Sequence, residues 1–267
     1  MINTFGMEFE IQGLSPAAAS RSLNNAGIDC DGGHESSWVS KYDGSVSRGA
    51  EVISPILTSA RLNEAHRVTK ALKTDGARVD RATGFHVHIG IQSLGSSNEA
   101  VFQRTPASNL ANLVINWYAA HHAIAALVAP SRLNNRYCRI LGEAEATEQA
   151  SYSSNGNRGA WNGNRYVSLN LESMQRHGTV EARLHQGTLN GVKAIAWSQF
   201  IAAFIDATSN KGLNALDMVG ISPFSHERGI YRSVNECYTL LDALVGLGSL
   251  NASTGDWLKN RADGLNR

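Results

Sequence analysis

Residues Thr4 to Gln12 read TFGMEFEIQ. The apolar residues of this stretch occupy every second position, which is the periodicity of a β-strand with one face in a hydrophobic core. Glu8 and Glu10 fall between them and therefore share the opposite face. The pattern predicts a half-buried strand that presents two carboxylates on its polar side.

The segments that follow predict a helix and a hairpin. A serine cap, a proline and a glycine stop indicate a helix over residues 16–26. Two short strands are then expected at 38–41 and 50–54, on either side of a turn-forming Asp-Gly-Ser sequence. This arrangement places Asp43 at the tip of the hairpin and Glu51 on the returning strand.

A second strand with a polar face reads FHVHIGI, at residues 85–91. Because side chains alternate along a strand, its two histidines point to one side. Two more alternating strands again place polar residues two positions apart: 165–171 carries Asn170, with Glu172 directly after its end, and 179–185 carries Glu181 and Arg183. Helical patterns are predicted at 58–73, 108–129, 192–207, 233–247 and 254–261, so that residues 208–267 form a helical C-terminal part.

Residues 142–164 are the one low-complexity stretch, rich in serine, asparagine and glycine. This composition predicts a flexible loop. The stretch lacks the residue order of a phosphate-binding P-loop, so it is not a nucleotide motif by itself. A lid that closes over substrates and a plainly disordered segment both fit it. With this loop included, residues 1–267 are expected to form a single catalytic domain.

The composition favours a soluble, cytoplasmic protein. Lysine and arginine total 24 against 23 acidic residues, and the net charge of +1 gives no clear nucleic-acid signal. No apolar run is long enough to span a bilayer, so we expect no membrane partner. The three cysteines are too widely spaced for a disulfide framework or a zinc motif, which suits a reducing compartment.

Carboxylates beside histidines on the polar faces of several strands point to metal binding. A solvated strand face normally carries threonine, lysine, serine or glutamine instead. If these strands are neighbours in a sheet, their carboxylates repel one another, and a stable arrangement then needs bound cations. Oxygen ligands with one or two imidazoles suit magnesium or manganese, whereas zinc prefers thiolates and several histidines. Mg²⁺ (or Mn²⁺) is therefore the expected ion.

Five short motifs occur in the order in which the putative amidoligase family has them, and their ordered combination resembles that family. They are GMEFE at 6–10, DGS followed by EVISP at 43–55, GFHVHIG at 84–90, RYVSLNL at 165–171, and TVEARLHQGTLN at 179–190. The family is related to glutamine synthetase and to the glutamate–cysteine ligases.

The resemblance implies an α+β, glutamine-synthetase-like catalytic domain. Such a domain has a largely antiparallel curved sheet with a polar metal-binding face, packed by helices and followed by C-terminal helices. The implied activity is an ATP-dependent carboxylate–amine ligase that forms an amide bond through an acyl-phosphate intermediate, with magnesium neutralising phosphate charge. Its partners would be a carboxylate substrate and an amine substrate, each a small molecule, a peptide or a modified nucleotide.

The same resemblance implies roles for individual residues. Metal near the nucleotide phosphates would be held by Glu8, His86 and Glu181. Metal nearer the acid substrate would be held by Glu10 and Glu51, with Asp43 as a further candidate. Phosphate oxygens would pair with Arg183, with Arg165 and His88 as further candidates, because guanidinium groups bind phosphate through two hydrogen bonds. Substrate or phosphate would be oriented by Asn170.

Plainer interpretations stay open for these residues. Two glutamates on one strand are also typical of an exposed face, and a strand histidine is often half-buried with its hydrogen bonds satisfied. Glu181 and Arg183 would form an ordinary surface ion pair if they stood alone. For the whole chain, the alternatives are a phosphotransferase of related fold and a non-catalytic or hydrolytic metal-binding module.

Overall fold

The computed structural model describes residues 4–30, 36–44, 49–90, 107–155, 164–221 and 231–266. The chain divides into two compact units: unit 1 comprises residues 1–89 and 185–198, and unit 2 comprises 90–184 and 199–267. The fold mixes helices with antiparallel strands, as the sequence predicted. The expectation of one catalytic domain stays a prediction.

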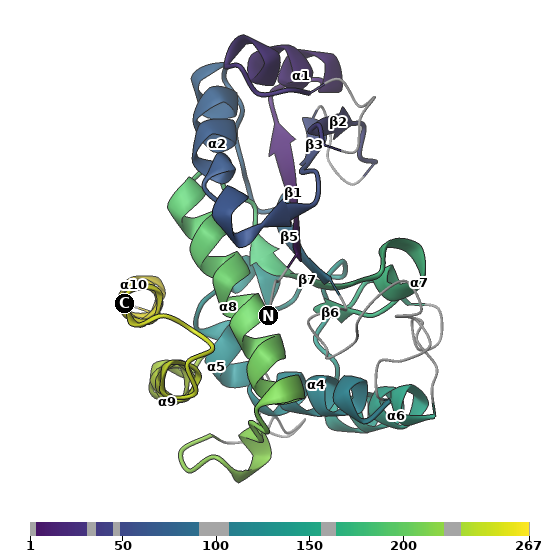
Figure 1. Ribbon diagram of the computed structural model, residues 1–267, viewed down its shortest axis with the longest axis vertical. Coiled ribbons are helices and arrows are strands. Elements are labelled where there is room, and N and C mark those ends of the chain that lie inside the picture. Colours follow the sequence, from purple (N-terminus) through teal and green to yellow (C-terminus); the bar gives the residue numbers. More distant parts are fainter. Residues whose placement is uncertain are drawn as a thin grey trace. The chain divides into compact units, whose positions relative to one another are not determined.

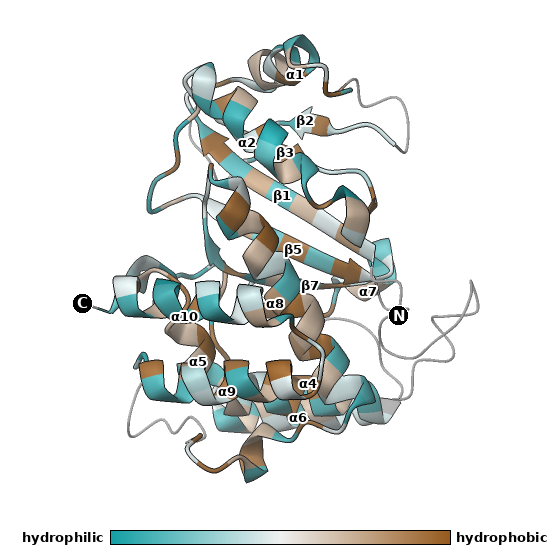
Figure 2. Ribbon diagram, turned by 60° about the vertical axis from the view of Figure 1, so that its left-hand side comes forward, coloured by the Kyte–Doolittle hydropathy of each residue, from teal (hydrophilic) through white to brown (hydrophobic). Residues whose placement is uncertain are grey.

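The sheet of unit 1 is built around strand β1, Thr4–Gln12. Its strands run in the order β2, β3, β1, β5, with β4 pairing the start of β1, and all of these pairings are antiparallel. Hydrophobic and hydrophilic residues alternate along β1 (Figure 2). The bounds are β1 Thr4–Gln12, β2 Val39–Lys41, β3 Gly49–Ile53, β4 Leu57–Thr58 and β5 Gly84–Gly90.

The apolar face of this sheet forms the core of unit 1. Phe9 contacts Phe85 on the neighbouring strand, with ring centroids 4.7 Å apart, and also contacts Trp38. All three side chains are almost fully buried, and such burial stabilises by about 2 kcal/mol for each aromatic side chain. The predicted strand periodicities of β1 and β5 are therefore confirmed, and they set which residues face the core.

Helices α1 (Pro16–Asn25) and α2 (Glu64–Thr74) cover unit 1, and the first turns of α8 (Gly191–Asn210) also belong to it. Helix α1 packs on α2 and on strands β2 and β3 (Figure 1). The Ser15 hydroxyl accepts a hydrogen bond from the amide of Ala18, which is the N-cap that the sequence predicted. A short 3₁₀ turn, η1 (Ser59–Arg61), precedes α2.

Unit 2 is mainly helical. Helix α4 packs along α6, and α9 packs against both α10 and α5 (Figure 1). Its strands β6 and β7 form an antiparallel pair, and the last two residues of β7 belong to unit 1. The bounds are α4 Ala107–Ala119, α5 His121–Ala125, η3 Pro130–Arg132, α6 Glu143–Ser154, β6 Leu169–Asn170, α7 Ser173–His177, β7 Thr179–Gln186, η5 Ala215–Asp217, α9 Val234–Gly246 and α10 Ala252–Leu265.

Within the described residues, no helix combines the length and the apolar character that crossing a bilayer requires.

Part of the predicted loop at 142–164 is corrected to a helix. Helix α6 covers Glu143–Ser154, and the later residues 156–163 lie outside the described part of the chain. The buried positions of α6 recur at helical spacing but carry alanine, glutamine and serine, so a search for large apolar residues misses them. Two glutamates in the first turn also favour a helix start.

Two other elements are shorter than the sequence predicted. The strand expected at 165–171 is reduced to Leu169–Asn170, because Asn164 accepts a hydrogen bond from the amide of Tyr166 and forms a turn there. The helix expected at 108–129 is interrupted at Ala120, whose backbone leaves helical geometry. Helix α7, between the strands β6 and β7, was not predicted.

Candidate functional site

Strands β1 and β5 bring two glutamates and two histidines onto one face of unit 1. Across the antiparallel ladder Glu8 is directly opposite His86, and Gly6 is opposite His88. Directly opposite residues point to the same side of a sheet, so the polar residues of both strands meet. The face is covered: His86 is 2% exposed and Glu10 is 6% exposed. An ordinary solvated strand face is therefore excluded.

The imidazole of His86 lies between two carboxylates. Its Nδ1 is 3.2 Å from Glu8 Oε2, and its Nε2 is 3.4 Å from Glu10 Oε1. The second histidine, His88, has Nε2 3.2 Å from the other oxygen of Glu8. Glu10 also accepts a hydrogen bond of 2.5 Å from the backbone amide of Gly84. The acidic strand and the histidine strand are therefore neighbours, and their carboxylates and imidazoles are in contact.

A third strand adds another carboxylate to this face. Glu51 on β3 is directly opposite Glu10, and it is 8% exposed. Lys41 on β2 is opposite Glu51 in turn, and its Nζ lies 3.0 Å from Glu51 Oε2. Asp43 follows β2 at the hairpin, as predicted, and is half-buried. Together these residues form the acid–histidine cluster: Glu8, Glu10, Glu51, His86 and His88.

The carboxylates of the cluster are electrostatically unlike one another. Burial alone would raise the pKa of Glu8, but hydrogen bonds from His86 and His88 outweigh it and hold that pKa well below its usual range. Burial, followed by the negative charge of Glu8, raises the pKa of Glu51 to about 7, although Lys41 partly offsets this. Negative charge is therefore crowded at Glu51, where a cation would relieve it.

Within unit 1, two groups of described residues offer ligand atoms close enough to share one ion. Glu8, Glu51 and His86 form one group, and Glu10, Asp43 and Glu51 form the other; within each, the ligand atoms lie within 4.8 Å of one another. Glu51 belongs to both groups. Carboxylate oxygens with a single imidazole are a donor set that suits Mg²⁺ or Mn²⁺ better than Zn²⁺. The donor chemistry of unit 1 therefore fits the cation that the sequence predicted.

Three of the remaining predicted residues, Asn170, Glu181 and Arg183, form a second group in unit 2, the Glu181–Arg183 group. Glu181 on β7 is directly opposite Asn170 on β6, whose side-chain amide donates a 2.7 Å hydrogen bond to Glu181 Oε2. Arg183, two residues further along β7, forms an ion pair with the other oxygen of Glu181. Its Nε also donates to the carbonyl of Tyr137 at 3.3 Å. This ion pair is buried, so the interpretation as an exposed surface pair is wrong.

Arg165 does not share the strand face of this second group. It is exposed, and its guanidinium lies over the ring of Tyr166. A hydrogen bond with the Tyr166 hydroxyl raises the pKa of Arg165, with smaller contributions from the charges of Glu181 and Glu172. Arg165 therefore stays fully charged at every ordinary pH, close to the group but outside its strands.

Two residues of unit 1 were missed from the sequence. Lys41 was not expected, although the antiparallel hairpin that it begins makes it a cross-strand neighbour of Glu51. Gly6 leaves room for His88, because a Cβ atom at Gly6 would lie 3.1 Å from His88 Cβ. The role of Gly6 depends on the register of β1 against β5, which the sequence of a single strand does not reveal.

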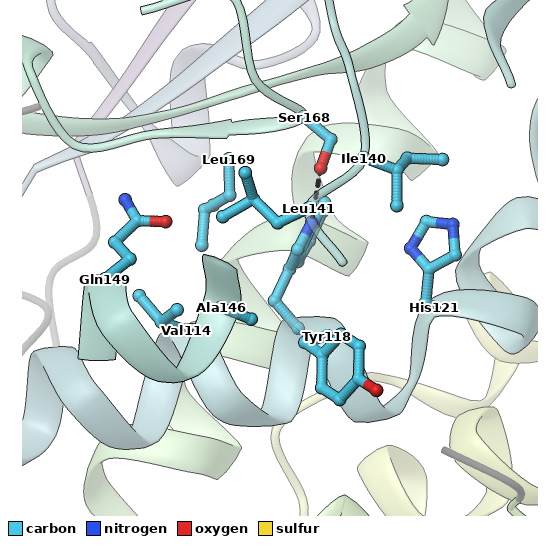
Figure 3. A pocket seen from close by; sticks show the side chains of 10 residues that line it. Val114, Tyr118, His121, Ile140, Leu141, Ala146, Gln149, Ser168 and Leu169 are labelled. Carbon is cyan, nitrogen blue, oxygen red and sulfur yellow. Dashed lines mark hydrogen bonds between the residues drawn. The ribbon is translucent and has the colours of Figure 1, made fainter. Parts of the chain in front are cut away.

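A small cavity in unit 2 lies beneath Ser168 (Figure 3). Trp117 Nε1 donates a 3.0 Å hydrogen bond to Ser168 Oγ at its wall, and His121 and Gln149 also line it. Its volume of about 10 Å³ admits roughly one water molecule. Such a cavity is too small for a substrate, so the acid–histidine cluster and the Glu181–Arg183 group remain the candidate machinery.

One family model matches the chain. Its description is "putative amidoligase enzyme", and the match runs over residues 2–205. It includes all the motifs from 6–10 to 179–190 and therefore every predicted site residue. No curated protein matches the chain.

Proposed function

Since the chain belongs to the putative amidoligase family, we propose that it is an ATP-dependent ligase that joins a carboxylate substrate to an amine substrate. A carboxylate oxygen of the acid would attack the γ-phosphorus of ATP, which forms an acyl phosphate and releases ADP. The amine nitrogen would then attack the carbonyl carbon, lose a proton and displace inorganic phosphate. The product is an amide, and the oxygen that leaves with phosphate originates from the acid.

One observation carries this proposal: the carboxylates of Glu8, Glu10 and Glu51 converge around His86 in a covered site. Like charges held together in a covered site cost free energy unless cations offset them. A protein that only needed a stable sheet would gain from apolar or neutral residues at these positions. The arrangement is the one expected where divalent cations accompany a polyphosphate substrate.

Mg²⁺ (or Mn²⁺) would be held by the two overlapping groups, Glu8 with Glu51 and His86, and Glu10 with Asp43 and Glu51. When bound, the cation would neutralise charge on the phosphate oxygens of ATP. The His86 ring, hydrogen-bonded between its neighbours, keeps Glu8 in its ionised form. Lys41 supplies a further positive charge beside Glu51.

Four residues are proposed to act on phosphate and substrate. Arg183 is oriented by Glu181 and by the carbonyl of Tyr137, so its guanidinium is fixed before a ligand arrives. Asn170 holds the other oxygen of Glu181 and completes this support. Arg165 and His88 are further candidates to pair with phosphate oxygens.

We also propose that the catalytic fold is of the glutamine-synthetase type. The support is an antiparallel sheet whose one face carries the carboxylates while helices pack around it. Both substrates are proposed to be a small molecule, a peptide or a modified nucleotide.

The decisive experiment uses an acid labelled with ¹⁸O in its carboxylate. The purified chain would be incubated with ATP, Mg²⁺ and a panel of such acids, with hydroxylamine as a general amine. The proposal predicts hydroxamate formation and transfer of one ¹⁸O atom into inorganic phosphate, both detected by mass spectrometry. Glu51→Gln should abolish both signals, whereas Asp75→Asn, an exposed acid of the same unit, should leave them unchanged.

Other outcomes separate the alternatives. ADP formation with a stable phosphorylated acceptor and no labelled phosphate would identify a phosphotransferase. Hydrolysis of a test ester or amide without ATP would identify a hydrolase. No turnover with any acid and no binding of ATP at any magnesium concentration would overturn the ligase proposal.

A further inference from the structure

A tripeptide, Asn-Arg-Tyr, occurs twice in unit 2. The copies are residues 135–137 and 164–166. In each copy the asparagine Oδ1 accepts a 2.9 Å hydrogen bond from the backbone amide of the tyrosine two residues later. The two copies therefore share one side-chain-to-backbone hydrogen bond as well as one sequence.

The arginine of each copy lies over the ring of the tyrosine that follows it. Arg136 Cζ is 4.8 Å from the centroid of Tyr137, and Arg165 Cζ is 5.2 Å from the centroid of Tyr166. Each guanidinium also donates to the hydroxyl of the same tyrosine, at 2.7 Å and 3.5 Å respectively. A cation–π contact of this kind restrains the arginine while its other N–H groups stay available.

The two copies are held together. The tyrosine rings meet edge to face, with centroids 5.6 Å apart. Just beyond them the backbones pair in parallel: the Arg139 amide donates to the Tyr166 carbonyl, and the Ser168 amide donates to the Arg139 carbonyl. Ser168 is fixed in turn by Trp117. Two Arg–Tyr units, Arg136 with Tyr137 and Arg165 with Tyr166, together form the Arg–Tyr pair.

The arginines of the Arg–Tyr pair differ from the arginines near them in how they meet acidic residues: the charges of Glu181 and Glu172 act on Arg165, but without a salt bridge. Nearby arginines are paired with carboxylates: Arg139 with Glu145, and Arg183 with Glu181. Among the described residues, neither Arg136 nor Arg165 forms such a salt bridge, and both are exposed. Two restrained guanidinium groups that are not held in salt bridges make a locally positive surface on a nearly neutral chain.

The Arg–Tyr pair adjoins the candidate machinery. The carbonyl of Tyr137 accepts the hydrogen bond from Arg183 Nε, so one residue both orients Arg183 and carries the first copy's ring. The amide of Arg183 also donates to the carbonyl of Ser168, at the end of the paired backbones. The surface is thus continuous with the Glu181–Arg183 group.

We propose that the Arg–Tyr pair binds the negatively charged oxygens of a multiply charged substrate. This inference rests on the proposed ligase function, which offers two such sources: the triphosphate of ATP and additional carboxylates of the acid substrate. Two arginines that lie over neighbouring tyrosine rings suit an anion with at least two charged groups, because each guanidinium can donate two parallel hydrogen bonds. The tyrosines position the arginines and need not touch the anion.

The test measures anion binding by calorimetry and does not depend on turnover. Tripolyphosphate represents the triphosphate, and citrate represents a polycarboxylate acid. Arg136→Gln and Arg165→Gln should each weaken binding of the same probe by roughly tenfold, the effect of losing one charge-assisted contact. Arg81→Gln, which removes an exposed arginine of unit 1, is the matched control and should change binding less than twofold.

A second set of variants tests the role of the rings. Tyr166→Phe keeps the ring under Arg165 and should bind the probe almost as tightly as the wild type. Tyr166→Leu removes the ring and should weaken binding nearly as much as Arg165→Gln. Urea denaturation of each variant establishes that the fold is kept, so a loss of binding reflects the arginine and not unfolding.

The outcomes distinguish the sources and the two proposals. If the arginine variants lose affinity for tripolyphosphate only, the surface binds ATP. If they lose affinity for citrate only, the surface binds the acid substrate. Equal binding by wild type, Arg136→Gln and Arg165→Gln, or an equal loss in Arg81→Gln, overturns the inference, as does a wild type that binds neither probe. If probe binding depends on both arginines but the ¹⁸O assay yields no labelled phosphate, the ligase proposal is wrong and the anion-binding inference stands.

Discussion

Glu8 lies directly opposite His86 across strands β1 and β5, with Glu8 Oε2 3.2 Å from His86 Nδ1. The other ring nitrogen of His86 faces Glu10, so one imidazole serves two acidic neighbours. Removal of this ring leaves both carboxylates without their shared contact in a covered site.

His86→Ala should therefore destabilise the metal-free protein by about 3 kcal/mol, the order found when one member of a buried pair is removed. The measurement is the urea midpoint of unfolding in the presence of a chelator. His66→Ala provides the comparison, because His66 is exposed on α2, and it should cost less than 1 kcal/mol, which is usual for a surface change. Similar losses in both variants would contradict the bridging role of His86.

Mg²⁺ should raise the unfolding temperature of the wild type. A ligand that binds only the folded state adds about 2.7 kcal/mol of stability at one hundred times its Kd. Glu51→Gln removes a ligand atom from both candidate groups and should lose most of this gain. Without metal the same variant should be about as stable as the wild type, because burial and Glu8 already disfavour the Glu51 charge and raise its pKa to about 7. A magnesium response equal in the wild type and Glu51→Gln would remove Glu51 from the metal site.

Arg183→Lys should lower turnover by roughly a hundredfold, because lysine keeps the charge but cannot reproduce the planar set of donors. The comparison is Arg176→Lys, which alters the ion pair of the exposed Arg176 with Glu172, four residues earlier in the chain, and should leave turnover unchanged. Steady-state kinetics of ADP release, with unfolding measured in parallel, separates catalysis from stability. Equal turnover in the two lysine variants would show that Arg183 is only structural.

Lowering the pH should lower the stability of the fold, in part because of His121. Burial, and then the charge of His122, lowers the pKa of His121 from 6.5 to about 3. Between these pH values the unfolded chain binds a proton that the folded chain rejects, so stability falls as pH falls through this window. One such group contributes a slope of up to about 1.4 kcal/mol per pH unit.

The test follows the urea midpoint from pH 7 to pH 4. His121→Gln should flatten the acid limb of the stability curve, whereas His66→Gln, at an exposed position, should keep the wild-type slope. An unchanged slope in His121→Gln would mean that other groups govern the loss of stability.

The sequence was most informative where one residue type repeats with a strand period. Alternation in β1 and β5 predicted both the core face and the shared side of Glu8, Glu10, His86 and His88. This worked because a strand turns by half a revolution per residue, so local spacing alone fixes the face. The roles of these residues in metal and phosphate binding stay predictions.

The sequence was least informative where contacts join distant segments or where small residues pack. Helix α6 escaped notice because its buried face carries alanine, serine and glutamine, and Arg165 left its predicted strand because Asn164 closes a turn. The repeated Asn-Arg-Tyr is short enough to arise by chance, and only the meeting of Tyr137 with Tyr166 gives it meaning. Pairing of this kind depends on the tertiary fold, not on local spacing.

Because β1 serves the core with one face and the acid–histidine cluster with the other, its length matters as much as its residues. An insertion or deletion of one residue within the strand would turn part of its acidic set inward and part of its apolar set toward the cluster. A substitution at Glu8 or Glu10 would therefore alter the site and leave the core face in place, whereas a shift in the frame of the strand would lose stability and site together. Among descendants of this chain, we expect β1 to vary by substitution and to stay free of single-residue gaps.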